Sequence, residues 1–324
     1  MSKRRINKQQ SARIQKQQAG YRDQDPEESL LNTNGLILTR FSRHASVEDE
    51  QGNRIRCSMR PNIDSLVAGD RVIWHPAGDN QGVIVSRYPR TSVLGRTDKR
   101  GGSKPVAANI TQIMVVVAAK PELSWPLLDS YLVMAENLGL FVTIVMNKID
   151  LPCADIQQEL IDTYQSLGYP IIFTCKNNLQ GLKSLQEALK NHVSVFVGQS
   201  GVGKSSLISN VLPHEENIVT AEISTISELG CHTTSNSHFY HLPAGGALID
   251  SPGVREFSLW QMPASDIIYG FKEFRKLVCE CKFRNCNHFD SPGCAFINAT
   301  KTGAVSQKRY NSLLKITAQH ACQK

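Results

Sequence analysis

One loop motif constrains this 324-residue chain more than any other feature. The segment Gly198-Gln199-Ser200-Gly201-Val202-Gly203-Lys204-Ser205 fits the pattern G-x-x-x-x-G-K-S/T. The apolar run Val193–Val197 before it predicts a buried strand, and Ser206 opens a segment that predicts a helix. Glycines let backbone N–H groups converge on phosphate oxygens, and the helix N-terminus adds a positive dipole. We therefore expect a nucleotide-phosphate loop, with Lys204 on the β- and γ-phosphates and Ser205 on Mg²⁺.

Two further loops indicate which base the nucleotide carries. Asn147-Lys148-Ile149-Asp150 follows the predicted strand Phe141–Met146. The Asp150 carboxylate can accept from both N1–H and the 2-amino group of guanine, whereas adenine offers neither donor and is rejected by such a site. Asn147 can bond the O6/N7 edge or hold the loop, and the Lys148 stem can pack on the base plane. Thr174-Cys175-Lys176 also ends a predicted strand, and its backbone N–H groups are expected to support O6.

A third group of residues is expected to sense the γ-phosphate. Asp250-Ser251-Pro252-Gly253 fits D-x-x-G, so Asp250 can hold Mg²⁺ through water and the Gly253 N–H can contact the γ-phosphate. Thr234, or alternatively Thr233, would complete the Mg²⁺ shell. Val254 stands where many GTPases carry a glutamine that orients the attacking water. His232 is our candidate for that role, and the alternative is a surface histidine without one.

The order of these motifs is informative. An ordinary small GTPase presents the phosphate loop first and the base loops last, whereas here both base loops precede residues 198–205. Each loop still follows its own strand, so a circular permutation lets the loops reassemble into one site. Alternating strands and helices predict a largely parallel sheet with helices on both faces. The segment after Gly253 then leads directly into the C-terminal part of the chain.

The N-terminal part has the composition of a nucleic-acid-binding module. Residues 1–20 hold six Lys or Arg and no acid, which accounts for most of the formal net charge of +7. Five short predicted strands between residues 35 and 95 indicate a small barrel such as an OB-fold. Residues 36–96 carry nine arginines and no lysine. Interleaved with Phe41, Trp74 and Tyr88, these arginines favour RNA binding. The alternative is that the aromatics are core and the arginines a solvated surface.

The cysteines indicate a metal site and a reducing compartment. Cys281-x4-Cys286-x-His288-x5-Cys294 supplies three thiolates and one imidazole, the donor set of a closed tetrahedral structural zinc site. Cys279 is a competing ligand. The other cysteines are scattered through predicted core segments, which argues against a secreted disulfide framework and for the cytoplasm. The longest apolar run, Ile113–Ala119, has seven residues, against the ~20 needed to cross a bilayer, so no membrane span is expected.

Together these motifs resemble the circularly permuted, ribosome small-subunit-dependent GTPases of the RsgA (YjeQ) type. The resemblance rests on NKID (147–150), GQSGVGKSS (198–206), HTT (232–234), DSPGVREF (250–257) and the Cys/His cluster. It implies a multidomain α/β protein: an OB-fold barrel that binds RNA (35–95), a permuted P-loop GTPase domain with a mostly parallel sheet (96–262) and a helical zinc-binding domain (263–324). The composition of residues 1–34 predicts a basic, disordered tail before them. It also implies that Ser206 belongs to the nucleotide site, that His232 acts in hydrolysis, and that one structural Zn²⁺ is bound.

The activity implied is hydrolysis of GTP to GDP and phosphate, with Mg²⁺, stimulated by the small ribosomal subunit during its late maturation. The partners are then that subunit and its rRNA, and the protein is expected to be a cytoplasmic monomer. A second hypothesis is an RNA-binding assembly protein for which GTP is only a structural ligand, since the usual glutamine is missing. A third, a P-loop ATPase acting on DNA, conflicts with Asp150.

Overall fold

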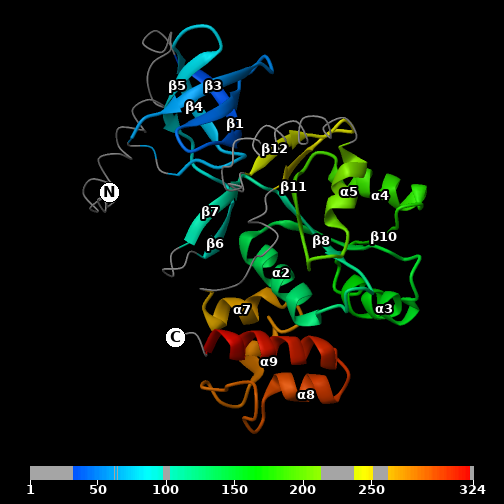
Figure 1. Cartoon of the computed structure of the whole chain (residues 1–324). Helices are drawn as coiled ribbons and strands as arrows, with labels where there is room; N and C mark the ends of the chain where they lie inside the picture. Colours follow the sequence, from blue (N-terminus) through cyan, green and yellow to red (C-terminus); the bar gives the residue numbers. More distant parts are fainter. Residues whose placement is uncertain are drawn as a thin grey trace.

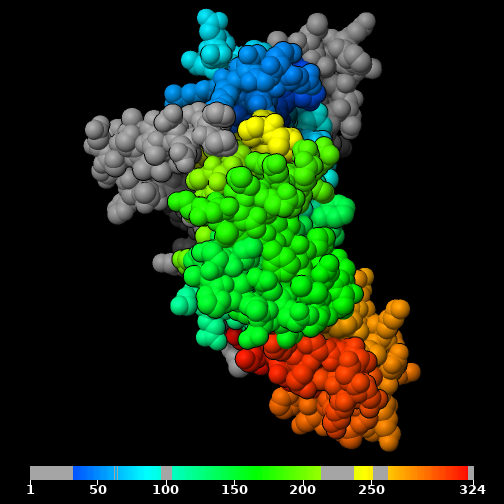
Figure 2. Space-filling view, turned by 90° about the vertical axis from the view of Figure 1, so that its right-hand side faces the viewer, coloured from blue at the N-terminus to red at the C-terminus, as the bar shows by residue number. Residues whose placement is uncertain are grey.

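The structure is a computed structural model, and it describes residues 32–61, 63, 65–97, 103–212, 237–250 and 262–321. The predicted tail up to residue 31, His232, Thr233, Thr234 and Gly253 lie outside the described residues. Three bodies follow one another along the molecule, with the barrel at one end and the C-terminal helices at the other (Figure 2). Among the described residues, no helix combines the length and apolar character that crossing a membrane requires.

The five predicted N-terminal strands form a closed barrel, as expected. β1 pairs with both β2 and β4, and the ring closes through β3 and β5. Alternate residues point inward, including Ile37, Val47 and Ile84, and exclude water from the centre. The strand bounds are β1 (Thr33–Arg40), β2 (His44–Glu48), β3 (Arg54–Met59), β4 (Arg71–Pro76) and β5 (Gln81–Arg87).

Two details of the N-terminal part are decided by the structure. Trp74 follows the alternative in which the aromatic ring is core: it is 5% exposed in the barrel, and its indole N–H donates to the Asn34 carbonyl at 3.2 Å. Residues 96–105 are rich in glycine and basic side chains and predict a linker from the sequence, but part of this segment lies in a hairpin of β6 (Val93–Thr97) and β7 (Ser103–Ala108). The hairpin buries Leu94 and Ala107 against the main core, which a solvated linker would leave exposed.

The central sheet carries the predicted nucleotide loops. Its strand order is β10-β9-β8-β11-β13, all parallel, and antiparallel β12 then joins this sheet to β1 of the barrel (Figure 1). These strands read as continuous apolar runs because helices cover both faces. Their bounds are β8 (Gln112–Val117), β9 (Phe141–Met146), β10 (Ile171–Phe173), β11 (Val193–Val197), β12 (His238–His241) and β13 (Ala247–Asp250).

Alternation along β8 assigns each helix to a face. Ile113 and Val115 belong to the core cluster of α2, whereas Met114 and Val116 belong to that of α4 and α5. The helix expected near 156–167 is a short α-helix continued by a π-helical turn. The bounds are α2 (Trp125–Leu138), α3 (Ala154–Glu159), η1 (Leu160–Gln165), α4 (Leu179–Leu189) and α5 (Lys204–Val211).

The C-terminal helices pack on α2. Arg309 of α9 is fully buried and bonds the Asp129 carboxylate of α2, and its guanidinium also pairs with Glu273 at 2.6 Å. Tyr164 of η1 donates to the same Asp129 oxygen at 2.9 Å, so the buried Asp129 carboxylate is paired with Arg309 and also hydrogen-bonded. The bounds are α7 (Ala264–Gly270), η2 (Leu277–Glu280), α8 (Ala295–Lys301) and α9 (Gln307–Ala321).

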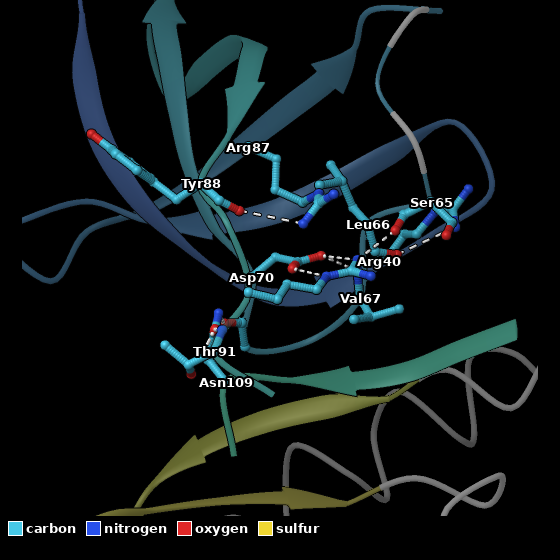
Figure 3. Close-up of polar contacts among 11 residues, drawn as sticks. Arg40, Ser65, Leu66, Val67, Asp70, Arg87, Tyr88, Thr91 and Asn109 are labelled. Atoms are coloured by element: carbon cyan, nitrogen blue, oxygen red, sulfur yellow. Dashed lines mark hydrogen bonds and ion pairs between the residues drawn. The ribbon is translucent and has the colours of Figure 1, made fainter. Parts of the chain in front are cut away.

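A buried ion pair joins Asp70, the residue before β4, to Arg90, in the segment that leaves the barrel after β5. Figure 3 shows the polar contacts around Asp70. Arg90 binds both carboxylate oxygens of Asp70, at 2.7 and 2.8 Å, and the carbonyl of Ser65 at 2.7 Å. Asp70 also accepts from the Val67 N–H, and the neighbouring Gly69 carbonyl accepts from the Asn109 amide. Arg90 is therefore structural, which removes one of the nine arginines from any RNA-binding surface.

Replacing Arg90 by Ala is expected to destabilise the chain by about 3–5 kcal/mol, because it leaves the fully buried Asp70 carboxylate without its cation. Arg90→Lys should recover only part of this, since an ammonium cannot form the paired contact. Chemical denaturation measures the effect. Arg71→Ala, at an exposed position of the same barrel, is the control and should change stability by about 0.5 kcal/mol or less. Equal stability of the two alanine variants would contradict the assignment.

Candidate functional site

The phosphate loop joins β11 to α5 and depends on its glycines. Gly198 and Gly203 have φ values of 137° and 98°, a region that favours glycine. A Cβ at Gly198 would clash with the Val116 carbonyl, and one at Gly203 with the Asn147 amide. The loop is thus packed closely against β8 on one side and against the predicted base loop on the other.

Lys204, the first residue of α5, lies folded over this loop. It is 7% exposed, and its Nζ donates to the carbonyls of Gly198 at 2.7 Å and Gln199 at 2.6 Å. Ser205 and Ser206 are exposed in the first turn of the helix, where N–H groups have no intrahelical partner. The ammonium group and these donors converge where phosphate oxygens would bind.

The base loop after β9 touches the phosphate loop directly. Asn147, 5% exposed, donates from its side-chain amide to the Val202 carbonyl at 2.9 Å. Lys148 donates from Nζ to the Gly201 carbonyl at 2.6 Å. Segments more than fifty residues apart in the sequence therefore meet at the carboxyl edge of the sheet, as the permuted order predicts.

The remaining base residues lie at the same edge. The Ile149 N–H donates to the Thr174 carbonyl at 3.3 Å, which ties the two base loops together. Asp150 is exposed and its carboxylate is accessible to a base, and Thr174 is fully buried. Lys176 is exposed and Cys175 half-buried. Asp250 ends β13, the neighbouring strand of β11, and so lies at this edge as well.

A further loop, residues 120–124 between β8 and α2, was not predicted from the sequence. The Gln199 side chain accepts from the Ser124 N–H and donates to the Glu122 carbonyl, both at 3.1 Å. Lys148 also donates to the Lys120 carbonyl at 3.0 Å. Both nucleotide loops are thus fastened to the segment that begins α2. Its position in the sequence is the signal that could have identified this loop, since the segment also follows a parallel strand and therefore lies at the same edge.

The predicted metal ligands come together in the C-terminal domain. The ligand atoms of Cys281, Cys286, His288 and Cys294 all lie within 4.8 Å of one another, a spacing that fits tetrahedral coordination. His288 presents Nδ1, 3.5 Å from the Cys281 sulfur, and burial lowers its pKa, which favours the neutral imidazole that a metal requires. Cys279 is exposed and outside this group. The cluster can therefore hold a metal ion.

The His288 ring is held in place by its neighbours. It stacks on Phe296 of α8 with ring centroids 4.0 Å apart and planes 9° from parallel. Tyr310 of α9 donates its hydroxyl to the His288 carbonyl at 2.7 Å. Support from two helices orients the donor before any metal binds.

Phosphate and base loops that meet at one sheet edge, in an order rotated relative to ordinary small GTPases, define a circularly permuted GTPase. The sequence model of the family described as RsgA GTPase matches residues 87–260. The chain belongs to this RsgA GTPase family, and it hydrolyses GTP.

Similar proteins cover nearly the whole chain. A protein of Alcanivorax borkumensis named small ribosomal subunit biogenesis GTPase RsgA is 44% identical over 98% of this chain and 96% of its own length. A Vibrio parahaemolyticus protein named small ribosomal subunit biogenesis GTPase RsgA 1 is 42% identical, over 97% of this chain and 91% of its own.

Solved structures agree with the fold. YjeQ from Thermotoga maritima has a TM-score of 0.74 and 31% identity, covering 91% of this chain and 100% of that one. YloQ, described as a circularly permuted GTPase, has a TM-score of 0.71 and 25% identity, covering 93% of this chain and 99% of that one. The permuted GTPase fold is thereby confirmed.

Proposed function

We propose that this chain hydrolyses GTP during biogenesis of the small ribosomal subunit, and that the subunit stimulates its turnover. The observation that carries the nucleotide part is the contact of Asn147 and Lys148 with the phosphate loop, which makes one site of base and phosphate loops. The names of the nearly full-length bacterial relatives support the ribosomal part. The protein then acts in the cytoplasm, where subunits are assembled, and as a single chain.

The residue roles in this proposal are those that the sequence motifs predict. Asp150 reads N1–H and the 2-amino group of guanine, with the Thr174-Cys175-Lys176 loop below O6. Lys204 binds the β- and γ-phosphates. Ser205 and Thr234, or Thr233, would hold Mg²⁺, with Asp250 acting through water and Gly253 on the γ-phosphate. Bound there, Mg²⁺ neutralises developing phosphate charge. His232 positions the attacking water, because Val254 cannot. The division into a tail, barrel, GTPase and zinc-binding domain at residues 34, 95 and 262 is part of this proposal.

Steady-state GTP turnover, measured with and without purified small subunits, tests the proposal. We expect the rate to rise when small subunits are added and to be unchanged by an equal amount of large subunits. If small subunits leave the rate unchanged while the protein still binds them, GTP is a structural ligand of an RNA-binding assembly protein. The missing glutamine at position 254 is the observation that keeps this second function in view.

The metal of the Cys/His cluster is zinc in this proposal. Four protein donors leave no open position, so the ion is structural, and it would fix a segment with little core of its own. The aromatic support of His288 is consistent with a rigid, prebuilt site.

Elemental analysis is expected to find about one zinc per chain, since a Cys3His set fills one tetrahedral shell. Cys286→Ser and His288→Ala should lose the metal and lower the melting temperature. Cys279→Ser is the matched control, because that thiol is exposed and outside the ligand group. Full zinc content in either ligand variant would contradict the assignment.

A further inference from the structure

A cavity of about 310 Å³ opens where the barrel meets the central domain. One wall comes from barrel strands β1 to β3 and the other from β12, which lies beside the barrel (Figure 1). The two walls meet at the bridge between Thr39 and His238, whose side chains are 2.9 Å apart and hydrogen-bonded. A ligand in this cavity would therefore touch both domains at once.

Aromatic rings gather on both walls. Phe41 and His44, at the ends of β1 and β2, stack with ring centroids 4.6 Å apart and planes 21° from parallel. On β12, His238 and Tyr240 stack with centroids 5.9 Å apart. All four rings are half-buried, so each is held in place while part of its surface reaches the cavity.

The charged side chains that line the cavity among the described residues are both positive. Arg54 and Arg56 project from the same outer face of β3, both exposed, and neither forms an ion pair within the described residues. No carboxylate lines the cavity among those residues. Burial and the nearby Arg56 guanidinium lower the pKa of His44, so its imidazole is neutral at pH 7 and can stack as an aromatic ring. Exposed guanidinium groups can bind a phosphate while the neighbouring rings stack on an aromatic base, so the cavity suits a nucleotide.

We propose that this cavity binds one unstacked nucleotide of single-stranded RNA, with its base against the rings and its phosphate on Arg54 and Arg56. Bases in a duplex are covered on both faces by their neighbours, so only a looped-out or single-stranded base presents a face to these rings. This cavity would be one of the RNA contacts of the proposed function, and the inference rests on that function. A bound nucleotide would brace the barrel against β12, the strand that begins four residues after Thr234 in the sequence.

Fluorescence anisotropy with the full chain tests this binding. The probe is a fluorescein-labelled ten-nucleotide RNA, used as a single strand and annealed to its complement. We expect wild type to bind the single strand more tightly than the duplex. Tyr240→Leu keeps apolar packing but removes the ring, and should weaken single-strand binding about 5- to 100-fold, the range for one base–aromatic contact. Arg56→Ala should weaken binding and lower the salt slope by about one.

Matched variants separate the cavity from the rest of the surface. Tyr269→Ala removes an exposed tyrosine of α7, and Arg71→Ala removes an exposed barrel arginine outside the cavity. Both should bind single-stranded RNA nearly as wild type does. His44→Ala is a second cavity variant in case Tyr240→Leu fails to fold, as judged by thermal melting.

Equal binding of duplex and single strand, or unchanged binding by the folded cavity variants, would overturn the proposal. Turnover with small subunits is measured separately on wild type. Tight, ring-dependent RNA binding without stimulation would leave the cavity assigned and reject the stimulated turnover of the proposed function. Stimulation by small subunits, together with RNA binding that the cavity variants leave unchanged, would support the proposed function and overturn the cavity assignment.

Discussion

Lys204→Ala is expected to abolish GTP turnover while the chain stays folded. In the structure this ammonium group lies within the phosphate loop, bonded to the carbonyls of Gly198 and Gln199 at 2.7 and 2.6 Å. Those contacts keep a positive charge at the place where the β- and γ-phosphates would bind. Transfer of a phosphoryl group depends chiefly on positioning and on neutralising charge as it develops. Removing one preorganised donor of this kind lowers kcat by about 10²–10³-fold or more.

The fold is expected to survive because the Lys204 ammonium group donates to two carbonyls of its own loop, at the carboxyl edge of the sheet. Turnover at saturating GTP and nucleotide affinity should be measured together with thermal melting. Lys190→Ala is the control, since the Lys190 side chain is 42% exposed and its surface pair with Glu187 is worth at most ~1 kcal/mol. A folded Lys204→Ala variant with wild-type turnover would exclude this loop as the site of chemistry.

Asp150→Asn is expected to change the preferred base from guanine to xanthine. The carboxylate would accept two hydrogen bonds from guanine, and each bond to a charged group is worth about 1.5–3 kcal/mol. Their loss should weaken GTP binding by about 10²- to 10⁴-fold. An asparagine amide can instead donate to the 2-oxo group of xanthine, so XTP should bind the variant better than GTP does.

Competition between GTP, XTP and ATP for a fluorescent nucleotide measures this preference. Asp155→Asn is the control, because Asp155 is an exposed carboxylate in the first turn of α3. It should leave the order of affinities unchanged. A variant at 150 that still prefers GTP over XTP, or wild type that binds ATP as well as GTP, would show that another residue reads the base.

The nucleotide site at the carboxyl edge of the central sheet could be predicted because each of its loops carries a local sequence signal. Each loop follows a buried strand, and parallel strands place their carboxyl ends at one edge, so the motif order alone predicted the permuted site. The contact between Asn147 and the Val202 carbonyl fits that expectation. The roles of individual site residues stay predictions, and those of His232, Thr234 and Gly253 concern residues outside the described ranges.

What was left open or missed depended on contacts between distant segments. Trp74 has an amphipathic ring that suits either a core or a stacking surface, and only the closure of the barrel decides between them. The hairpin β6–β7 was missed because charged residues and Gly101-Gly102 suggested a linker, although a glycine pair between two short runs is also a hairpin signal. Arg309 was overlooked because its two carboxylate partners lie 36 and 180 residues away.

The position of α2 has a consequence for heat denaturation. This helix lies in the core of the central domain, and its Asp129 and Glu136 side chains are neutralised by Arg309, Lys272 and Arg275 of the C-terminal region. If the C-terminal helices melted first, Asp129 and Glu136 would lose their counter-ions. The apolar surface of α2 around them would also become exposed to water. Calorimetry should therefore record one endotherm for both parts, and a fragment that ends before residue 263 should aggregate rather than behave as an independent domain.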